Sequence, residues 1–380
     1  MTAALVRMLG DFDLAEELVQ EALLEALEHW PNEGIPQRPG AWLLTTARRK
    51  GLDRLRREAR YREKLDLLEK EHVSADTAEG DDRLRLIFTC CHPALSREAQ
   101  LALTLRAVAG LTTTEIARAF ITNEATIAQR IVRAKRKIVD ANIPYRIPND
   151  QDLGERVDEV LAVLYLMFNE GYLATSERGS RRDLAEDAAW LAGLMVRLMP
   201  EQAEALGLLA LMRLHLGRAD ARFDAEGSIV LLQDQDRSRW GRERIASAIG
   251  LLHRAAALRQ PGPYQLQAAI AACHAEAPSW EQTDWRQIIA LYDTLLEMAP
   301  SSVVQLNRAI ALRYLEGAQS ALREVDGLTQ ALDNYYLFHA TRAELLRDLG
   351  RGQEASIAIT RALQLTANPA ERALLHKRLG

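Results

Sequence analysis

The sequence predicts an all-α protein in which two small helical domains precede a larger helical domain. Alanine, leucine, arginine and glutamate dominate the 380 residues, and these residue types favour helices. Glycine and proline, which break helices, number only 21 and 12. Long segments free of these breakers alternate with short stretches that are rich in proline, glycine or acidic residues.

The interruptions divide the chain. Residues 1–30 predict helix, and the stretch 31–40 predicts a loop because it holds three prolines and two glycines. Residues 41–72 then predict one long helix. Helices separated near His92-Pro93 and Gly110 are expected later in the chain. The predicted segments are a first domain at 1–72, an acidic linker at 73–82, a second domain at 83–142, a linker at 143–152 and a third domain at 153–380.

The third domain contains a weak internal repeat. The dipeptide Arg308-Ala309 recurs 34 positions later as Arg342-Ala343, and each opens a helix that ends in a glycine-containing turn. This period is that of a tetratricopeptide helix pair. Either such a repeat or a plain bundle of antiparallel helices explains the pattern.

The charge distribution is uneven. The net charge is −5, yet residues 48–64 hold nine cations against three acids, a local balance of +6. This asymmetry suits a protein with one surface for nucleic acid and other surfaces for proteins. No signal layout or apolar run of membrane-spanning length is visible, so a cytoplasmic location is expected.

The strongest chemical signal is a helix-turn-helix at residues 112–138. Asn123 is suited to cap the second helix, because its side chain accepts from the free N–H groups of the next turn. An apolar stripe along that helix predicts the face that packs on its own domain; it consists of Ile127, Ile131, Ala134 and Ile138. The opposite face offers Thr126, Gln129, Arg130, Arg133, Arg136 and Lys137.

That opposite face suits DNA. A helix in the major groove needs small or polar residues near its N-terminal end to reach base edges, and cations further along to meet phosphates. An ordinary helical hairpin with a solvated basic face would share the spacing. The cap, the short turn and the one-sided charge together favour DNA.

The helix at 41–64 carries the +6 segment. Its cations form a broad face, and Trp30 and Trp42 bracket its start. Cations beside aromatic rings suit single-stranded DNA, although both rings also fit a place in the core. Just upstream, the helix at 11–28 has an inward stripe and an outward acidic ridge. The stripe is Ala15, Leu18, Val19, Ala22 and Ala26, and the ridge is Glu17, Glu21, Glu25 and Glu28.

These segments, in this order, resemble the extracytoplasmic-function (ECF) sigma factors. Residues 11–27 resemble the polymerase-binding helix of the second sigma domain. Residues 42–57 resemble the helix that reads the −10 promoter element, and residues 115–137 resemble the helix-turn-helix that reads the −35 element. Within this family, one subgroup has a tetratricopeptide-like extension. This chain resembles that subgroup in residues 86–95 (LIFTCCHPAL), residues 168–172 (FNEGY) and the helical C-terminus.

The resemblance implies a transcription initiation factor, not an enzyme, with no cofactor or metal of its own. Its partners would be core RNA polymerase and promoter DNA. Separately from the resemblance, the size of residues 153–380 and their own dense apolar pattern predict an intramolecular contact through which this domain regulates or completes the sigma domains. The implied −35 residues are Asn123, Glu124, Thr126, Gln129, Arg130, Arg133, Arg136 and Lys137. The implied −10 residues are Trp42, Arg49, Lys50, Arg54 and Arg57, and the implied polymerase-binding residues are Asp13, Glu17, Gln20 and Glu21.

Two departures from the family pattern stand out. Only ten residues precede Asp11, where the family usually has about one more helix, so the first sigma domain is expected to be short. Ile121 occupies a turn position where the family often has glycine, and glycine eases a positive φ there.

Three other readings compete. Cys90, Cys91 and Cys273 with His92 and His274 would make a zinc site, but adjacent cysteines lack the usual spacing, and structural burial is expected. A helix-turn-helix regulator that does not touch polymerase would leave residues 11–57 unexplained. A scaffold of helical repeats would leave the basic helices unexplained.

Overall fold

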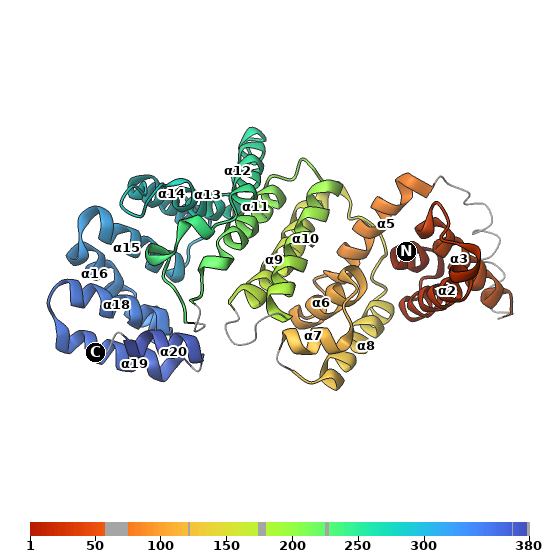
Figure 1. Cartoon of the computed structure of the whole chain (residues 1–380), viewed down its shortest axis with the longest axis horizontal. Coiled ribbons are helices and arrows are strands. Elements are labelled where there is room, and N and C mark those ends of the chain that lie inside the picture. Colours follow the sequence, from red (N-terminus) through yellow and green to blue (C-terminus); the bar gives the residue numbers. More distant parts are fainter. Residues whose placement is uncertain (58–74, 121, 174–179, 225–227, 367, 378–380) are drawn as a thin grey trace. The chain divides into compact units, whose positions relative to one another are not determined.

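The computed structural model describes residues 1–57, 75–120, 122–173, 180–224, 228–366 and 368–377 (Figure 1). Helices dominate throughout the described part, where the β-type pairing found is one isolated bridge between Phe223 and Ile229. The all-α prediction is therefore confirmed. The chain forms two compact units, Met1–Leu166 and Met167–Gly380, and the boundary falls inside helix α9 (Asp150–Leu173).

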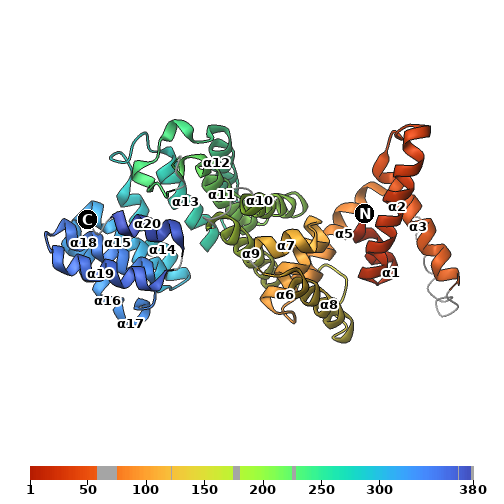
Figure 2. The same ribbon diagram turned by 60° about the horizontal axis from the view of Figure 1, so that its bottom comes forward.

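Three helices begin the first unit: α1 (Thr2–Leu9), α2 (Phe12–Glu33) and α3 (Pro39–Arg57) (Figure 2). The predicted helix over 1–30 is thus two helices. Gly10 ends α1 with a φ of 66°, a conformation that glycine adopts without steric cost. The Asp11 side chain then caps α2 by accepting from the backbone N–H groups of Asp13 and Leu14 at 2.8 and 3.0 Å.

The second helix also extends further than the composition predicts. Pro31 lies inside α2, which continues to Glu33, whereas the loop was expected to start at residue 31. Only the last turn follows Pro31, so few backbone hydrogen bonds are at stake there. Helix α3 packs closely on α1 and α2 at Gly51, where an added Cβ would lie 3.1 Å from the Leu18 side chain and 3.2 Å from the Met8 side chain.

A second group of helices completes the first unit. Its helices are α5 (Ala75–Cys90), α6 (Arg97–Thr104), the π-helical turn η2 (Leu105–Ala109), α7 (Thr113–Ala119) and α8 (Glu124–Asp140). Helix α5 begins inside the stretch predicted as an acidic linker, because its alanines and acids are compatible with helix. The predicted breaks occur between Cys90 and Arg97 and at Gly110, where φ is 82°.

The two groups of the first unit meet around Asp82, which is 1% exposed. Its carboxylate lies 2.9 Å from Arg7 on α1. The Tyr145 hydroxyl lies within hydrogen-bond distance of the carbonyl oxygens of Ala3 and Asp82, at 2.8 and 3.0 Å. Burial raises the pKa of Tyr145, so the hydroxyl keeps its proton and donates. These contacts tie α1 to α5.

The second unit is a series of helices packed on their neighbours in sequence. They are α10 (Ser180–Leu198), α11 (Ala203–Gly217), α12 (Arg242–Ala257), α13 (Pro263–Glu276), α14 (Trp285–Met298), α15 (Ser302–Glu316), α16 (Ala318–Gly327), α17 (Thr329–Leu332), α18 (Tyr336–Asp348), α19 (Gly352–Leu365) and α20 (Pro369–Lys377). Short 3₁₀ turns lie between α11 and α12. Helix α11 is buried along nearly its whole length and forms the centre of the unit's first part.

The 34-residue period has a structural counterpart. Helices α15 and α18 start 34 residues apart, and their partners α16 and α19 also start 34 residues apart. Ala309 and Ala343, which the period relates, are both fully buried. Within this stretch, two helical hairpins therefore repeat with the period that the sequence predicts.

Candidate nucleic-acid and polymerase interfaces

Helix α8 has the architecture that the sequence predicts for a recognition helix. The Asn123 side chain accepts from the Thr126 backbone N–H at 2.7 Å and from the Thr126 hydroxyl at 2.8 Å, which confirms the cap. The predicted inward stripe is buried at all four positions, namely Ile127, Ile131, Ala134 and Ile138. The turn residue Ile121 lies outside the described residues.

The residues predicted for the outward face of α8 are polar, and most of them are exposed. Gln129, Arg133 and Lys137 are exposed, and Arg130 and Thr126 are half-buried. Arg136 is exposed and pairs with Asp140 one turn away, at 3.4 Å. Glu124 accepts from the Thr113 hydroxyl at 3.0 Å, so this side chain also joins α7 to α8.

Sequence reasoning missed two apolar residues on that outward face. Val132 is 64% exposed and Val139 is 71% exposed. Both lie off the buried stripe in the helical register, which was the signal available in the sequence. Exposed valines beside cations suit contact with the methyl groups and sugars of a groove as well as contact with a protein.

Lys135 departs from the other cations of α8 because it is buried. Its Nζ lies 2.7 Å from Asp13 Oδ1 and 3.3 Å from Glu16 Oε2, at the start of α2. Arg106 Nη2 lies 3.6 Å from the same Glu16 oxygen. Asp13, a predicted polymerase-binding residue, thus already has a cationic partner within the chain.

The predicted polymerase-binding acids and the predicted DNA-binding cations also face each other across α2 and α3. Arg54 Nη1 lies 2.8 Å from Glu17 Oε1. Lys50 Nζ lies 3.5 Å from Glu21 Oε2 and 3.0 Å from Glu25 Oε2, and Arg49 Nη2 lies 2.9 Å from Glu25 Oε1. The hydrogen bond between Lys50 and Glu25 lowers the pKa of the carboxyl and raises that of the amine.

These ion pairs between α2 and α3 change the interpretation of the acidic ridge. The ridge was expected to point outward, and part of it faces the cations of α3 instead. Arg49 keeps 67% of its side chain exposed and Arg54 keeps 41%, so both still reach solvent. The side chain of Arg57 lies outside the described residues.

The exposed face of α2 carries leucines that sequence reasoning left unassigned. Leu24 is 61% exposed and Leu27 is 71% exposed, while Leu23 is 38% exposed. Gln20, a predicted polymerase-binding residue, is exposed one turn before Leu24. Gln20, Leu24 and Leu27 therefore make a stripe at helical spacing beside the ion pairs.

The inward side of α2 and the two tryptophans follow the sequence more closely. Ala15, Leu18, Ala22 and Ala26 are buried, as predicted, and Val19 is half-buried. The rings of Trp30 and Trp42 meet edge to face with centroids 5.6 Å apart, and both are half-buried. They brace the α2–α3 hairpin and leave part of each ring accessible.

The cysteines fit burial better than metal binding. Cys90 and Cys91 are buried, as expected, and Cys273 is half-buried. Burial raises the pKa of Cys91 to about 11, which disfavours the thiolate that a metal needs. Among the described residues, no three histidine, cysteine or acidic side chains are grouped as a metal site requires.

The helices of the described part are too short or too polar to cross a membrane.

Comparison with known proteins agrees with the order of these segments. Residues 1–61 match the family model for sigma-70 region 2, and residues 85–138 match the model for sigma-70 region 4. Residues 156–256 match a family of unknown function, DUF6596.

Individual relatives extend this result, one over nearly the whole chain and two over about a third of it. A Rhizobium meliloti protein described as uncharacterized is 45% identical over 387 aligned positions, which cover 99% of this chain and 92% of the relative. The ECF RNA polymerase sigma factor SigK of Mycobacterium ulcerans is 32% identical over 150 positions, or 36% of this chain and 78% of the relative. SigK of Mycobacterium tuberculosis is 34% identical over 145 positions, covering 35% and 74%.

Proposed function

Because the chain belongs to the ECF sigma factors, we propose that it binds core RNA polymerase and directs it to promoters with a −10 and a −35 element. The observation that carries this proposal is the capped helix α8 with its one-sided cationic face, placed after a region 2 hairpin. The proposal assigns no catalytic step to the chain. Nucleotide addition would be the work of the polymerase.

In this proposal, α8 reads the −35 element. Thr126 and Gln129 lie near its N-terminal end, where side chains reach base edges in the major groove. Arg133, Arg136 and Lys137 follow further along and would meet phosphates. Asn123 and Glu124 would act mainly by fixing the start of α8, since both side chains bond within the chain.

The −10 element would be bound at α3. Arg49 and Arg54 remain exposed beside their glutamate partners, and the half-buried Trp42 lies near the start of the same helix. Backbone charge and base stacking are the two sources of affinity for single-stranded DNA. Lys50 and Arg57 complete the proposed set.

Core polymerase would dock on α2. The exposed stripe of Gln20, Leu24 and Leu27 supplies the apolar contact, and Glu17 and Glu21 supply charge at its edge. Protein interfaces commonly combine an apolar centre with a charged rim. This arrangement supports a larger role for the leucines than for the acids.

A transcription assay tests the whole proposal. Run-off transcription from a promoter selected with this protein should need both core polymerase and the full chain. Leu24→Glu should abolish capture of core polymerase while leaving the helix content unchanged, and Ile35→Glu, an exposed residue beyond α2, is the control. Promoter binding without any polymerase contact would instead support a regulator of the helix-turn-helix type.

We further propose that residues 153–380 regulate the sigma domains through an intramolecular contact. The size of the second unit and its own apolar cores support a folded partner domain. A chain that ends at Leu173 keeps the contact of Arg97 with Glu159, at 2.9 Å, and should be compared with the full chain in run-off transcription. Loss or gain of activity would give the sign of the regulation. Unchanged activity, with no binding between the separated parts, would refute it.

A further inference from the structure

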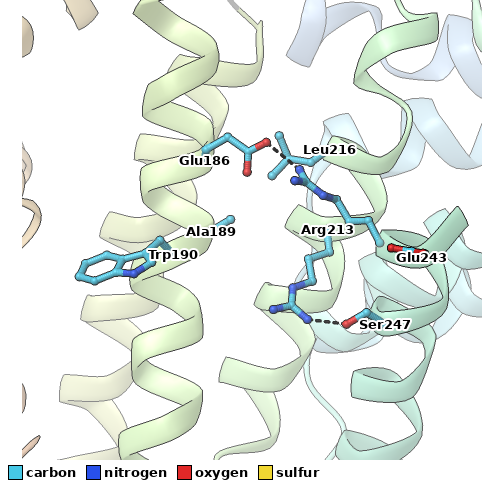
Figure 3. A pocket seen from close by; sticks show the side chains of 8 residues that line it. Glu186, Ala189, Trp190, Arg213, Leu216, Glu243 and Ser247 are labelled. Carbon is cyan, nitrogen blue, oxygen red and sulfur yellow. Dashed lines mark hydrogen bonds and ion pairs between the residues drawn. The ribbon is translucent and has the colours of Figure 1, made fainter. Parts of the chain in front are cut away.

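A pocket of about 420 Å³ lies in the second unit between α10, α11 and α12 (Figure 3). Every residue that lines it falls inside the 156–256 segment, well outside the matched sigma regions. The lining combines four charged side chains with three apolar ones and one hydroxyl: Glu186, Arg213, Glu243 and Arg244, then Ala189, Trp190 and Leu216, and Ser247. The volume is within the range of small-ligand sites.

Arg213 is the unusual member of this lining. Helix α11 is buried at most of its positions, yet it carries this half-buried guanidinium. Within the described residues, its hydrogen-bond partner is the neutral Ser247 hydroxyl, which accepts from Nη1 at 2.5 Å. Burial lowers the pKa of Arg213, and the positive charge of the nearby Arg244 lowers it further.

The second guanidinium is already neutralised. Arg244 Nη1 lies 2.7 Å from Glu186 Oε1, and this ion pair bridges α12 and α10. It is the dashed line that starts at Glu186 in Figure 3. Among the described residues, no carboxylate forms an ion pair with the Arg213 guanidinium. The exposed carboxylate of Glu243 at the rim would oppose a ligand with two negative charges.

We propose that this pocket binds a singly charged organic carboxylate, with the carboxylate on Arg213 and the apolar part of the ligand against Ala189 and Leu216. A planar guanidinium holds a carboxylate through two parallel hydrogen bonds, and the half-buried setting strengthens them. The Ser247 hydroxyl is free to turn and donate to the same carboxylate. A free small acid and the acidic side chain of a peptide share this chemistry.

Binding of matched probes to the full chain tests the proposal. Calorimetric titration with 3-phenylpropionate should give saturable binding, and the neutral 3-phenylpropionamide should bind at least tenfold more weakly. The peptide acetyl-Ala-Glu-Leu-amide, with its glutamine counterpart as control, separates the two sources. Binding of the free acid alone indicates a small-molecule site, and selective binding of the glutamate peptide indicates a protein segment.

Variants locate the site. Arg213→Gln should weaken binding of the acid at least tenfold, while Arg254→Gln, an exposed arginine on α12 outside the pocket, should leave it unchanged. Ser247→Ala releases Arg213 from its neutral partner and should keep the preference for the acid over the amide. If Arg213→Gln fails to fold by circular dichroism, Arg213→Lys must retain that preference. Equal binding of acid and amide, unchanged affinity in Arg213→Gln, or failure of both acidic probes to bind would overturn the proposal.

Discussion

At the scale of single residues, the proposed recognition helix α8 has one cap, one buried stripe and one exposed face. Asn123 satisfies free N–H groups at the start of α8 and thereby fixes where the exposed face begins. Gln129 comes early on that face and Arg133 one turn later. If α8 binds the major groove as proposed, position along the helix would decide whether a side chain reaches bases or phosphates.

Substitutions of Gln129 and Arg133 should consequently have different effects on promoter binding. Arg133→Ala should weaken binding to all promoter sequences and flatten the salt dependence, because it removes a phosphate contact. Gln129→Ala should shift base preference at the −35 element and leave the salt dependence unchanged. Selection from a randomised promoter library, with each variant titrated at several salt concentrations, measures both effects. Identical profiles for the two variants would contradict this division.

A second prediction at residue scale concerns His215 in the second unit. Burial, followed by Arg218 and Arg222, lowers its pKa to about 3. The neutral ring accepts from Arg218 Nη2 at 3.0 Å, a bond that protonation would break. The unfolded chain takes up this proton near the ordinary value of 6.5, so stability is fully present above pH 6.5 and falls as the pH drops toward 3.

Unfolding in urea, followed by tryptophan fluorescence, measures that loss. From pH 7 to pH 5, protonation of His215 in the unfolded chain should cost about 2 kcal/mol of unfolding free energy. His274, whose pKa is lowered to about 4 chiefly by burial, adds to the same trend. His215→Gln should reduce the pH dependence, and His253→Gln, which changes an exposed histidine, should not. A pH dependence unaltered by His215→Gln would rule out this residue as its source.

At the scale of elements, the charged residues that pair α2 with α3 are also residues proposed to bind polymerase or DNA. The Glu17–Arg54 pair is about half exposed, so its contribution to stability is expected to be about 1 kcal/mol or less. Its larger effect is to hold two exposed faces in register. One face is the leucine stripe of α2, and the other is the cationic side of α3.

A charge swap separates these two roles of Glu17. Glu17→Arg alone should lower both stability and the capture of core polymerase, and more strongly at low salt. Adding Arg54→Glu restores the ion pair, so thermal stability should return to the wild-type value while polymerase binding stays weak. Full recovery of polymerase binding in the swapped protein would show that Glu17 acts only within the hairpin.

The cations of α3 are predicted to act during melting of the promoter. Removing Arg49 and Arg54 together, as glutamines, should reduce open complexes several-fold more than initial duplex binding, because single-stranded DNA depends on backbone charge. Permanganate reactivity of thymines in the −10 region reports melting, and Arg38→Gln, a cation just before α3, is the control. Normal thymine reactivity in the double variant would count against this role.

The elements show what periodicity reveals and what it hides. The inward stripe and cap of α8 were predictable because they depend on residues within one helix. The break at Gly10 and the start of α5 at Ala75 were not, because single-residue signals compete there with long helix-favouring surroundings. The ion pairs of Lys50 and Lys135 escaped prediction since periodicity does not say which faces meet.

At the scale of the whole molecule, ion pairs in the first unit link helix α8 to the start of helix α2. Buried Lys135 on α8 pairs with Asp13 and Glu16 at the beginning of α2, and Arg106 supports it from η2. Asp13 is 81% exposed, so a partner protein can still reach it from outside. The proposed −35 reader and the proposed polymerase-binding helix are therefore joined before any partner arrives.

The ion pairs of Lys135 with Asp13 and Glu16 should protect the first turns of α2 from hydrogen exchange. Lys135→Ala removes the shared cation and leaves two acids close together, so the first turns of α2 should exchange amide hydrogens about three- to tenfold faster. Hydrogen exchange of the full chain, read by mass spectrometry, measures this change. Lys137→Ala, an exposed cation of the same helix, should leave exchange in α2 unchanged. Raising the salt concentration should reduce the difference between wild type and Lys135→Ala only in part, because salt screens the pair with exposed Asp13 more than the pair with half-buried Glu16. Equal exchange rates in the wild type and Lys135→Ala would mean that the apolar contacts and the Tyr145 hydrogen bond hold the unit together without this charge.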